Sequence, residues 1–183
     1  MKIIIINGSP LAAKGNTNII TEAFSRGAIV AGAEIEHIYL AKQNLKPCTA
    51  CESCWSITPG ECVLNDDGKI ILERIMDAEL LIFATPLYVD NVTGLMKNFM
   101  DRILGILIGK IYSTDEVKLE KTGVISSCSF RGKEQFDVLR LLFKRLAKKM
   151  GKELAVEIYR DNGPVLQDKN FKSTANCHGK PKV

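Results

Sequence analysis

The sequence predicts a three-layer α/β fold built on a five-stranded parallel sheet of order 2-1-3-4-5. Short apolar runs alternate with helical patterns, each helical stretch keeps its apolar residues on one face, and no linker or repeat divides the 183 residues. Strands that alternate with helices join by right-handed crossovers, which gives a parallel sheet with two faces to cover. Hydrophobic residues make up 46% and charged residues 25%, a balance typical of one globular domain.

The first half of the chain supplies three of the strands. Each strand is a short apolar or alternating run, and each is followed by a polar turn. A pair of acidic residues before an apolar helical pattern is typical of a helix start. Strands are therefore expected at residues 3–6, 35–40 and 80–84, and helices at 16–31 and from Asp66 or Asp67 through Ile70, Ile71, Leu72 and Ile75.

The second half of the chain completes the sheet but lacks the helix that would complete one of the two outer layers. Strands are expected over 122–127 and 154–158, and a long loop rich in Gly, Ser and Asp is expected after 104. One helix is expected over 92–104. A second helix is expected around an apolar stripe made of Phe136, Leu139, Leu142, Phe143, Leu146 and Met150. In this order the helix after the last strand helps to cover the face that carries the first helix. No convincing final helix follows residue 158, so we expect a domain over 1–160 and a polar tail over 161–183. That tail should be partly disordered, or pack on the sheet or on a partner subunit that completes the second face.

Composition excludes several classes of partner. The net charge of +4 is modest, and the one basic group, Lys144, Arg145, Lys148 and Lys149, lies opposite an apolar stripe, which favours a solvated face over a nucleic-acid site. The first apolar run is too short for a signal peptide or a membrane span. We therefore expect a cytoplasmic protein without nucleic-acid or membrane partners. In a reducing cytoplasm, clustered cysteines more often bind metal or do redox chemistry than form structural disulfides.

A phosphate loop is predicted between the first strand and the first helix. Gly8-Ser9-Pro10 and Gly15-Asn16-Thr17 lie where the strand order reverses, and helix N-termini bind anions there. The spacing matches neither the Walker pattern nor G-x-G-x-x-G, so a mononucleotide phosphate fits better. The candidate residues are Ser9, Pro10, Lys14, Asn16 and Thr17. The alternative is a plain turn in which Asn16 or Thr17 caps the helix.

Two further loops follow strands on the other side of the same point. Backbone N–H groups beside Pro86 are placed to reach the polar edge of a flavin, and Leu87 or Tyr88 can pack on its face. The alternative is an ordinary loop with Tyr88 in the core. The loop over 126–132 can complete the pocket with hydroxyl and N–H groups. The candidates are Pro86, Leu87, Tyr88, Val89, Asn91, Ser127 and Cys128.

The spacing of Cys48, Cys51, Cys54 and Cys62, inside an insertion over 44–64, predicts a cluster loop. Three closely spaced thiols can wrap one cubane, and a fourth can return to close it. Zinc usually prefers two separated pairs. A [4Fe–4S] site is the favoured interpretation, while a thiol/disulfide loop, a zinc site and an unoccupied loop remain open. The remaining two cysteines lie in other regions and are not expected to be ligands.

These motifs resemble the NAD(P)H-dependent FMN reductase group of flavodoxin-like proteins. The resemblance covers about residues 1–130 and rests on the sequences of residues 7–10, 15–17, 85–88, 91–92 and 95–102. It implies bound FMN, with the phosphate on Ser9, Asn16 and Thr17 and the ring on residues 86–91. It also implies a homo-oligomer, dimer or tetramer, often paired through the helix carrying Leu95, Met96, Phe99, Met100 and Ile103. Two departures are a short, glycine-poor loop over 126–132 and the missing closing helix.

The cysteine spacing is similar to that of iron-sulfur flavoproteins, a branch of the same group. Flavin accepts a hydride from a nicotinamide and releases single electrons, whereas a cubane handles one electron at a time. We therefore expect an FMN-dependent oxidoreductase that passes electrons between flavin, a [4Fe–4S] cluster and an external redox partner such as ferredoxin, with NAD(P)H as candidate donor and no catalytic side chain. Because the cysteine loop follows an edge strand, its electron route to flavin is expected to cross a subunit contact. The alternatives are an NAD(P)H-dependent FMN or quinone reductase without a cluster, a flavodoxin-like carrier, and a regulatory thiol or metal-sensing module.

Overall fold

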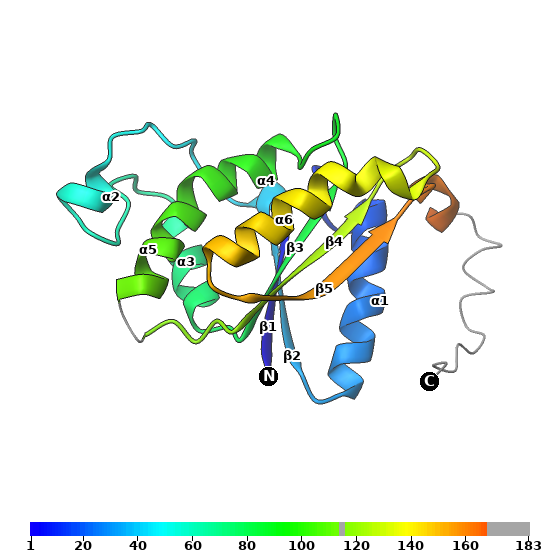
Figure 1. The fold of residues 1–183 in the computed structure, drawn as a ribbon, viewed down its shortest axis with the longest axis horizontal. Coiled ribbons are helices and arrows are strands. Elements are labelled where there is room, and N and C mark those ends of the chain that lie inside the picture. The colour runs from blue at the N-terminus through cyan, green and yellow to red at the C-terminus, as the bar shows by residue number, and fades with distance from the viewer. Residues whose placement is uncertain (114–115, 168–183) are drawn as a thin grey trace.

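The computed structural model of the protein describes residues 1–113 and 116–167. Within them the chain alternates strands and helices as the apolar pattern predicts (Figure 1). The strands are β1 (Lys2–Asn7), β2 (Glu34–Tyr39), β3 (Leu80–Pro86), β4 (Lys121–Ser127) and β5 (Glu153–Arg160). The α-helices are α1 (Asn16–Val30), α2 (Ser53–Ser56), α3 (Gly68–Met76), α4 (Gly94–Phe99), α5 (Gly105–Ser113) and α6 (Asp137–Lys149). Shorter turns are η1 (Ala12–Lys14), η2 (Leu40–Lys42), the π-helical η3 (Met100–Leu104), η4 (Lys133–Phe136) and η5 (Gly163–Gln167).

The five strands form one parallel sheet of order β2-β1-β3-β4-β5, which confirms the predicted flavodoxin-like topology. In the register, Ile3 of β1 lies opposite Ile35 of β2 on one side and Leu80 of β3 on the other. The central strands are buried on both faces because helices cover them, so they read as continuous apolar runs. The strand order reverses at β1, which places the candidate loops on both sides of that strand.

The two faces of the sheet carry cores of different size. The larger core packs α3, α4, α5 and α6 against side chains such as Ile4, Ile6 and Phe83. The smaller core lies under α1 and contains Ile3, Ile5 and Ile82. Figure 1 shows α1 separated by the sheet from α4 and α6. The predicted division of helices between the two faces is therefore confirmed.

The predicted loop after residue 104 is wrong over its first nine residues, which form α5. Ile106 and Leu107 are buried in the larger core, and the π turn η3 carries the helix on from α4. The helix was not predicted because Gly105 and Gly109 lower the helix propensity of this segment. Packing of its buried side chains stabilises it in the folded protein.

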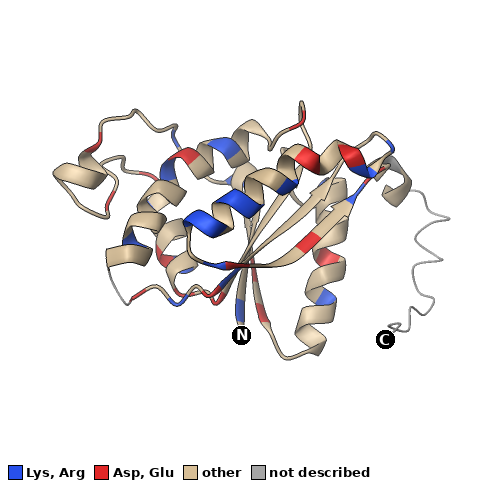
Figure 2. Ribbon diagram, in the orientation of Figure 1, with Lys and Arg blue, Asp and Glu red and all other residues tan. Residues whose placement is uncertain are grey.

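Three of the five helix residues expected at a subunit contact are not available for one. Met96, Phe99 and Ile103 are at most 1% exposed within the chain's own core, and only Leu95 and Met100 are half-buried. Pairing through this helix would therefore rest on fewer apolar side chains than expected. The basic group on α6, by contrast, is exposed as predicted, and Figure 2 shows it as a blue stripe along the helix.

The second face stays partly open in the described residues. After β5 they include the short turn η5, which packs against α1, and no α-helix. A groove of about 520 Å³ runs beside α1 and is lined by Met1, Ile3, Ala23, Phe24, Gly27, Ala28, Leu80, Lys121, Ala155 and Val156. Completion of this face by the tail or by another subunit remains a prediction, since residues 168–183 lie outside the described ranges. None of the described helices is both long and apolar enough to cross a membrane.

Gly27→Ala is expected to stabilise the protein by about 0.5–1 kcal/mol, because glycine inside a helix destabilises it by that amount relative to alanine. Gly27 lies within α1, and a Cβ built on it meets no atom within 4 Å. Urea unfolding of both proteins would measure the difference in the free energy of unfolding. An unchanged or lowered midpoint would contradict this view of α1.

Candidate functional site at the carboxyl edge of the sheet

Three loops meet at the carboxyl ends of β1, β3 and β4. The amide of Gly8 donates to the carbonyl of Ala84 at 2.8 Å, and the hydroxyl of Thr93 donates to the carbonyl of Gly8 at 2.6 Å. The amide of Leu87 donates to the carbonyl of Ser127 at 2.8 Å. These bonds join the three predicted loops into one structure, although more than a hundred residues separate the first from the last.

The loop after β1 is shaped by close backbone approach. A Cβ on Gly8 would lie 2.8 Å from the Cβ of Met96, so only glycine fits at this position. Ser9 is buried, its amide donates to Oδ1 of Asn7 at 2.9 Å, and its hydroxyl accepts from the amide of Leu11 at 3.3 Å. The Nδ2 group of Asn7 is buried without a hydrogen-bond partner. The Nδ2 group of Asn7 is therefore a buried hydrogen-bond donor at the base of this loop that has no acceptor within the described residues.

Gly15, and neither Asn16 nor Thr17, is the N-cap of α1. The alternative interpretation, a plain turn in which one of these two residues caps the helix, is therefore wrong about the cap. Because glycine has no side chain to offer, the first N–H groups of α1 lack a side-chain cap and stay available to an anion. The sequence alone did not show whether Asn16 or Thr17 is the N-cap or already a helical residue, because Asn and Thr occur at both kinds of position.

The side chains predicted to hold a phosphate have different surroundings. The hydroxyl of Thr17 is buried and bonded to that of Ser127 at 2.9 Å. Oδ1 of Asn16 accepts from Nε2 of Gln167 in η5 at 2.7 Å. Pro10 and Lys14 are exposed at the rim of the loop. The structure thus gathers all five candidates around the start of α1, and Gln167 is a neighbour that sequence reasoning missed.

The loop after β3 is a tight hairpin with strained residues at its tip. The amide of Tyr88 donates to the carbonyl of Asn91 at 2.9 Å, and the amide of Asn91 donates back to Tyr88 at 3.0 Å. Between them Val89 and Asp90 have φ of 48° and 55°, a conformation that is unusual for non-glycine residues and an outlier for β-branched valine. Tyr88 is 50% exposed and Val89 99% exposed, so the alternative that buries Tyr88 in the core is wrong.

The loop after β4 is anchored from β5. Cys128 is buried, its amide donates to the carbonyl of Arg160 at 3.0 Å, and its own carbonyl accepts from the amide of Gly163 at 2.7 Å. Burial raises the pKa of the Cys128 thiol, and the thiol donates to the carbonyl of Phe130 at 3.2 Å. Its side chain packs in the larger core, so the thiol is neutral and held by the protein itself.

The four clustered cysteines surround one cavity. Cys48, Cys51, Cys54 and Cys62 all line a space of about 110 Å³ whose other lining includes Trp55, Arg102 and Ile106. All four are free thiols, Cys48 and Cys51 exposed and the other two half-buried. In the described part of the chain, no three His, Cys, Asp or Glu side chains are arranged around a single metal ion. The four thiols therefore line a shared cavity and do not converge on the position of a single metal ion.

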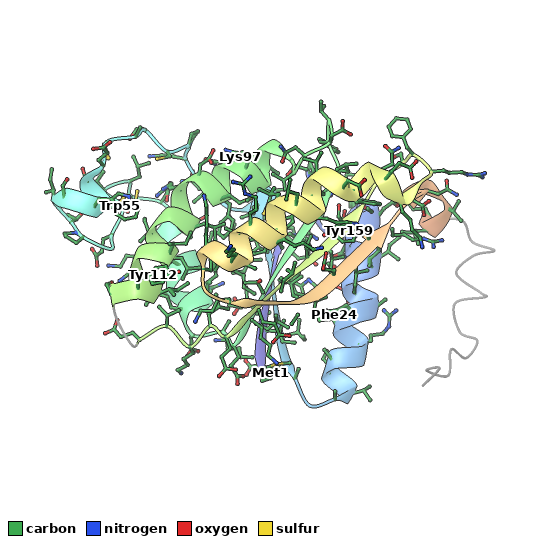
Figure 3. All side chains as sticks on the ribbon, viewed as in Figure 1. Met1, Phe24, Trp55, Lys97, Tyr112 and Tyr159 are labelled. Atoms are coloured by element: carbon green, nitrogen blue, oxygen red, sulfur yellow. The ribbon has the colours of Figure 1, made fainter. Side chains whose placement is uncertain are left out.

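The backbone around these thiols is also strained. Ala50 and Glu52, on either side of Cys51, have φ of 52° and 57°. Hydrogen bonds from the side chain and then the backbone of Ser53 lower the pKa of Cys51, while burial, followed by the neighbouring thiols, raises that of Cys54. Trp55 projects over α5, where a Cβ on Gly109 would meet its ring at 4.0 Å (Figure 3). The loop is thus closed on one side by α5 and open on the other.

An ion pair at the base of the loop was not predicted. Arg102 and Asp66 have side chains that are 1% and 0% exposed, and Nη2 of Arg102 lies 2.7 Å from Oδ1 of Asp66. Burial raises the pKa of Asp66, but hydrogen bonds from Arg102 and from the amides of Lys46 and Gly68 outweigh it and lower the pKa to about 2. The amide of Gly68 makes Asp66 the helix-capping side chain, although Asp67 holds the cap position of α3.

These features define a flavodoxin-like α/β protein whose ligand edge is assembled from three loops. The chain belongs to the NADPH-dependent FMN reductase family, whose sequence pattern matches residues 1–147. This is a family of flavin-dependent oxidoreductases, and its match covers both the carboxyl-edge loops and the cysteine loop.

Individual relatives agree with this assignment. The chain is 37% identical over 102 residues to an iron-sulfur flavoprotein of Archaeoglobus fulgidus, a match that covers 56% of this chain and 48% of that protein. It is 38% identical over 102 residues to YwqN of Bacillus subtilis, named as an NAD(P)H-dependent FMN-containing oxidoreductase, covering 56% and 51%. The matches thus span about half the length of these curated relatives.

The fold also matches a solved structure over its whole length. An NAD(P)H:quinone oxidoreductase from Methanothermobacter marburgensis superposes with a TM-score of 0.72 at 21% identity, over 100% of this chain and 99% of that one. At this identity the likeness concerns the fold alone. It agrees with the sheet order derived from the sequence.

Proposed function

We propose that the protein is an FMN-dependent oxidoreductase of the iron-sulfur flavoprotein branch, which passes electrons between flavin, a [4Fe–4S] cluster and an external redox partner. The observation that carries the proposal is the convergence of four free thiols on one cavity in a chain that also has the three-loop flavin edge. The names of several relatives support the branch.

The residues at the carboxyl edge fit the parts of FMN. The uncapped start of α1 and Ser9 suit the phosphate, and the unpaired Nδ2 of Asn7 offers a further donor there. The strained hairpin around Val89 and Asp90 presents backbone N–H groups and the exposed Tyr88 to a flat ring. Bound flavin would supply hydride acceptance and one-electron release. The protein would orient the ring and exclude water from one of its faces.

The cysteine loop fits a cluster better than a single ion. Cys48, Cys51, Cys54 and Cys62 would be the ligands, since thiolates hold iron-sulfur clusters and these four share one cavity. Hydrogen bonds already reach two of the sulfurs, from the amide of Ala50 to Cys48 at 3.5 Å and from Arg102 to Cys62 at 3.3 Å. Such bonds are the protein's means of tuning a cluster.

Exposed apolar side chains on the cysteine loop support a contact with a partner. The loop lies beside α3 and α5, away from the hairpin after β3 (Figure 1). Trp55 and Ile57 are 65% and 78% exposed on it. A contact with a second subunit or with a ferredoxin would cover these side chains. NAD(P)H is the candidate donor of electrons.

Anaerobic purification with iron, sulfide and flavin assays tests the function. We expect one FMN and about four irons per chain, a number set by the cubane. Cys51→Ser is expected to lose iron and keep flavin, whereas Cys128→Ser, the same change at a thiol outside the loop, should keep iron. Flavin without iron and with rapid NAD(P)H oxidation would favour a cluster-free FMN or quinone reductase. Flavin without nicotinamide turnover would favour a simple electron carrier.

A further inference from the structure

Arg102 is a buried charge that neither the flavin edge nor the thiol ligands require. It is 3% exposed and lies in the π-helical turn η3, between α4 and α5. A π turn inserted in an α-helix often marks a functional position, because it redirects side chains that a regular helix would place elsewhere. Here the redirected side chain enters the base of the cysteine loop.

The guanidinium of Arg102 has five N–H donors, and five acceptors surround it. Nε donates to Sγ of Cys62 at 3.3 Å. Nη1 donates to the carbonyl of Lys46 at 2.9 Å and to one carboxylate oxygen of Asp66. Nη2 donates to the other oxygen of Asp66 at 2.7 Å and to the carbonyl of Leu64 at 3.3 Å. Every donor is used, and all five bonds go to the two ends of the loop.

The carboxylate of Asp66 also links the two ends of the cysteine loop. Its Oδ2 accepts from the amide of Lys46 at 2.9 Å, and its Oδ1 accepts from the amide of Gly68 at 3.0 Å. We call Arg102 and Asp66 together the clasp. Because the pair is neutral as a whole, its burial is compensated, while the arginine still presents an N–H group and positive charge to the sulfur of Cys62.

We propose that Arg102 is the positioning residue of the cysteine loop: it fixes the sulfur of Cys62 and favours the more reduced form of a cluster bound there. The second part rests on the proposed function. Hydrogen bonds to ligand sulfurs and nearby charge are among the features that set cluster potentials, and both stabilise the more negative form. Lysine does not replace arginine here, because an ammonium group has three donors and no planar fork.

Two variants separate the bonds from the charge. Arg102→Gln removes the charge and the five-donor fork, and Arg102→Lys keeps the charge but loses the fork. The control is Arg74→Gln, which removes the same charge from an exposed arginine paired with Glu36, away from the thiols. Circular dichroism and thermal melting report whether each variant is folded. If Arg102→Gln does not fold, Arg102→Lys carries both measurements.

The first measurement is the cluster potential, by titration with electron paramagnetic resonance on anaerobically purified protein. We expect Arg102→Gln to lower the reduced-to-oxidised ratio at a fixed potential by about tenfold, equivalent to about 59 mV for one electron. Arg102→Lys should lie between this variant and the wild type, and Arg74→Gln should match the wild type. Folded Arg102 variants with the wild-type potential would overturn the redox part of the proposal.

The second measurement needs no cluster. In iron-free, reduced protein, amide hydrogen exchange over residues 44–46 and 64–68 is expected to be at least about tenfold faster in both Arg102 variants than in the wild type or Arg74→Gln. Equal exchange rates would overturn the positioning role. A wild type that binds flavin but no iron would instead overturn the proposed function and with it the redox part, and the exchange rates would still decide whether Arg102 holds the loop.

Discussion

Gly8→Ala is expected to weaken FMN binding by about 100-fold, which corresponds to about 2.7 kcal/mol. The new methyl group would lie 2.8 Å from the Cβ of Met96 and 3.1 Å from the hydroxyl of Thr93. The Cβ of Met96 belongs to the rigid part of α4 and cannot rotate away. The loop must therefore move, and it carries Ser9 and the entry to α1 with it. Overpacking of this kind also lowers the free energy of unfolding by about 1–3 kcal/mol.

Fluorescence quenching of added FMN measures this effect, with urea unfolding as the parallel measure of stability. Gly94→Ala is the matched control, because it places the same methyl group at the start of α4, near the same edge, where nothing lies within 4 Å. The control should bind FMN as the wild type does. Equal affinities for wild type and Gly8→Ala would mean that flavin does not bind at this loop.

The sheet and its order could be predicted because they depend on local patterns. Apolar runs such as residues 3–6 and 80–84 are long enough to mark buried strands, and their alternation with helices leaves few topologies. The position of the loop between β1 and α1 could be predicted for the same reason, since Gly8 and Gly15 mark the turn between a strand and a helix. In both cases the signal lies within about ten neighbouring residues.

The features that were missed depend on contacts between distant residues. Arg102 and Asp66 are 36 residues apart, and Asn16 and Gln167 are 151 residues apart. Nothing in a helix stripe shows that one of its charged residues turns inward, because a π turn is not visible in the apolar spacing. The turn η5 at the start of the tail was likewise not predicted, and it packs on α1.

Backbone strain offers an independent view of the candidate sites. Six non-glycine residues of the described ranges have positive φ, and five of them lie in the loops predicted to hold a ligand: Ala12, Ala50, Glu52, Val89 and Asp90. Each such residue costs about 1–3 kcal/mol and persists only where its surroundings enforce it. Among the described non-glycine residues, only Asn162 has this conformation outside those loops, and backbone strain concentrated in this way is typical of sites shaped for binding.

Asp66→Asn is expected to lower the free energy of unfolding by about 3–5 kcal/mol, because it leaves the buried guanidinium of Arg102 without its counter-charge. Urea unfolding at neutral pH measures this loss. The control is Asp101→Asn, which makes the same change in an exposed pair with Lys97, where i,i+4 pairs contribute about 0.3–0.5 kcal/mol. Similar small losses for both variants would show that the clasp does not stabilise the fold.

The pH dependence of the stability of Asp66→Asn distinguishes the loss of the ion pair from a disturbance of packing. The pKa of Asp66 is lowered from 3.8 to about 2, so its contribution is fully present above about pH 4 and is lost as pH falls toward 2. A shift of this size corresponds to about 2 kcal/mol. The difference in stability between wild type and Asp66→Asn should therefore shrink by about that amount between pH 5 and pH 2. A difference that stays constant over this range would mean that the asparagine disturbs packing, and that the carboxylate charge contributes nothing to holding the cysteine loop.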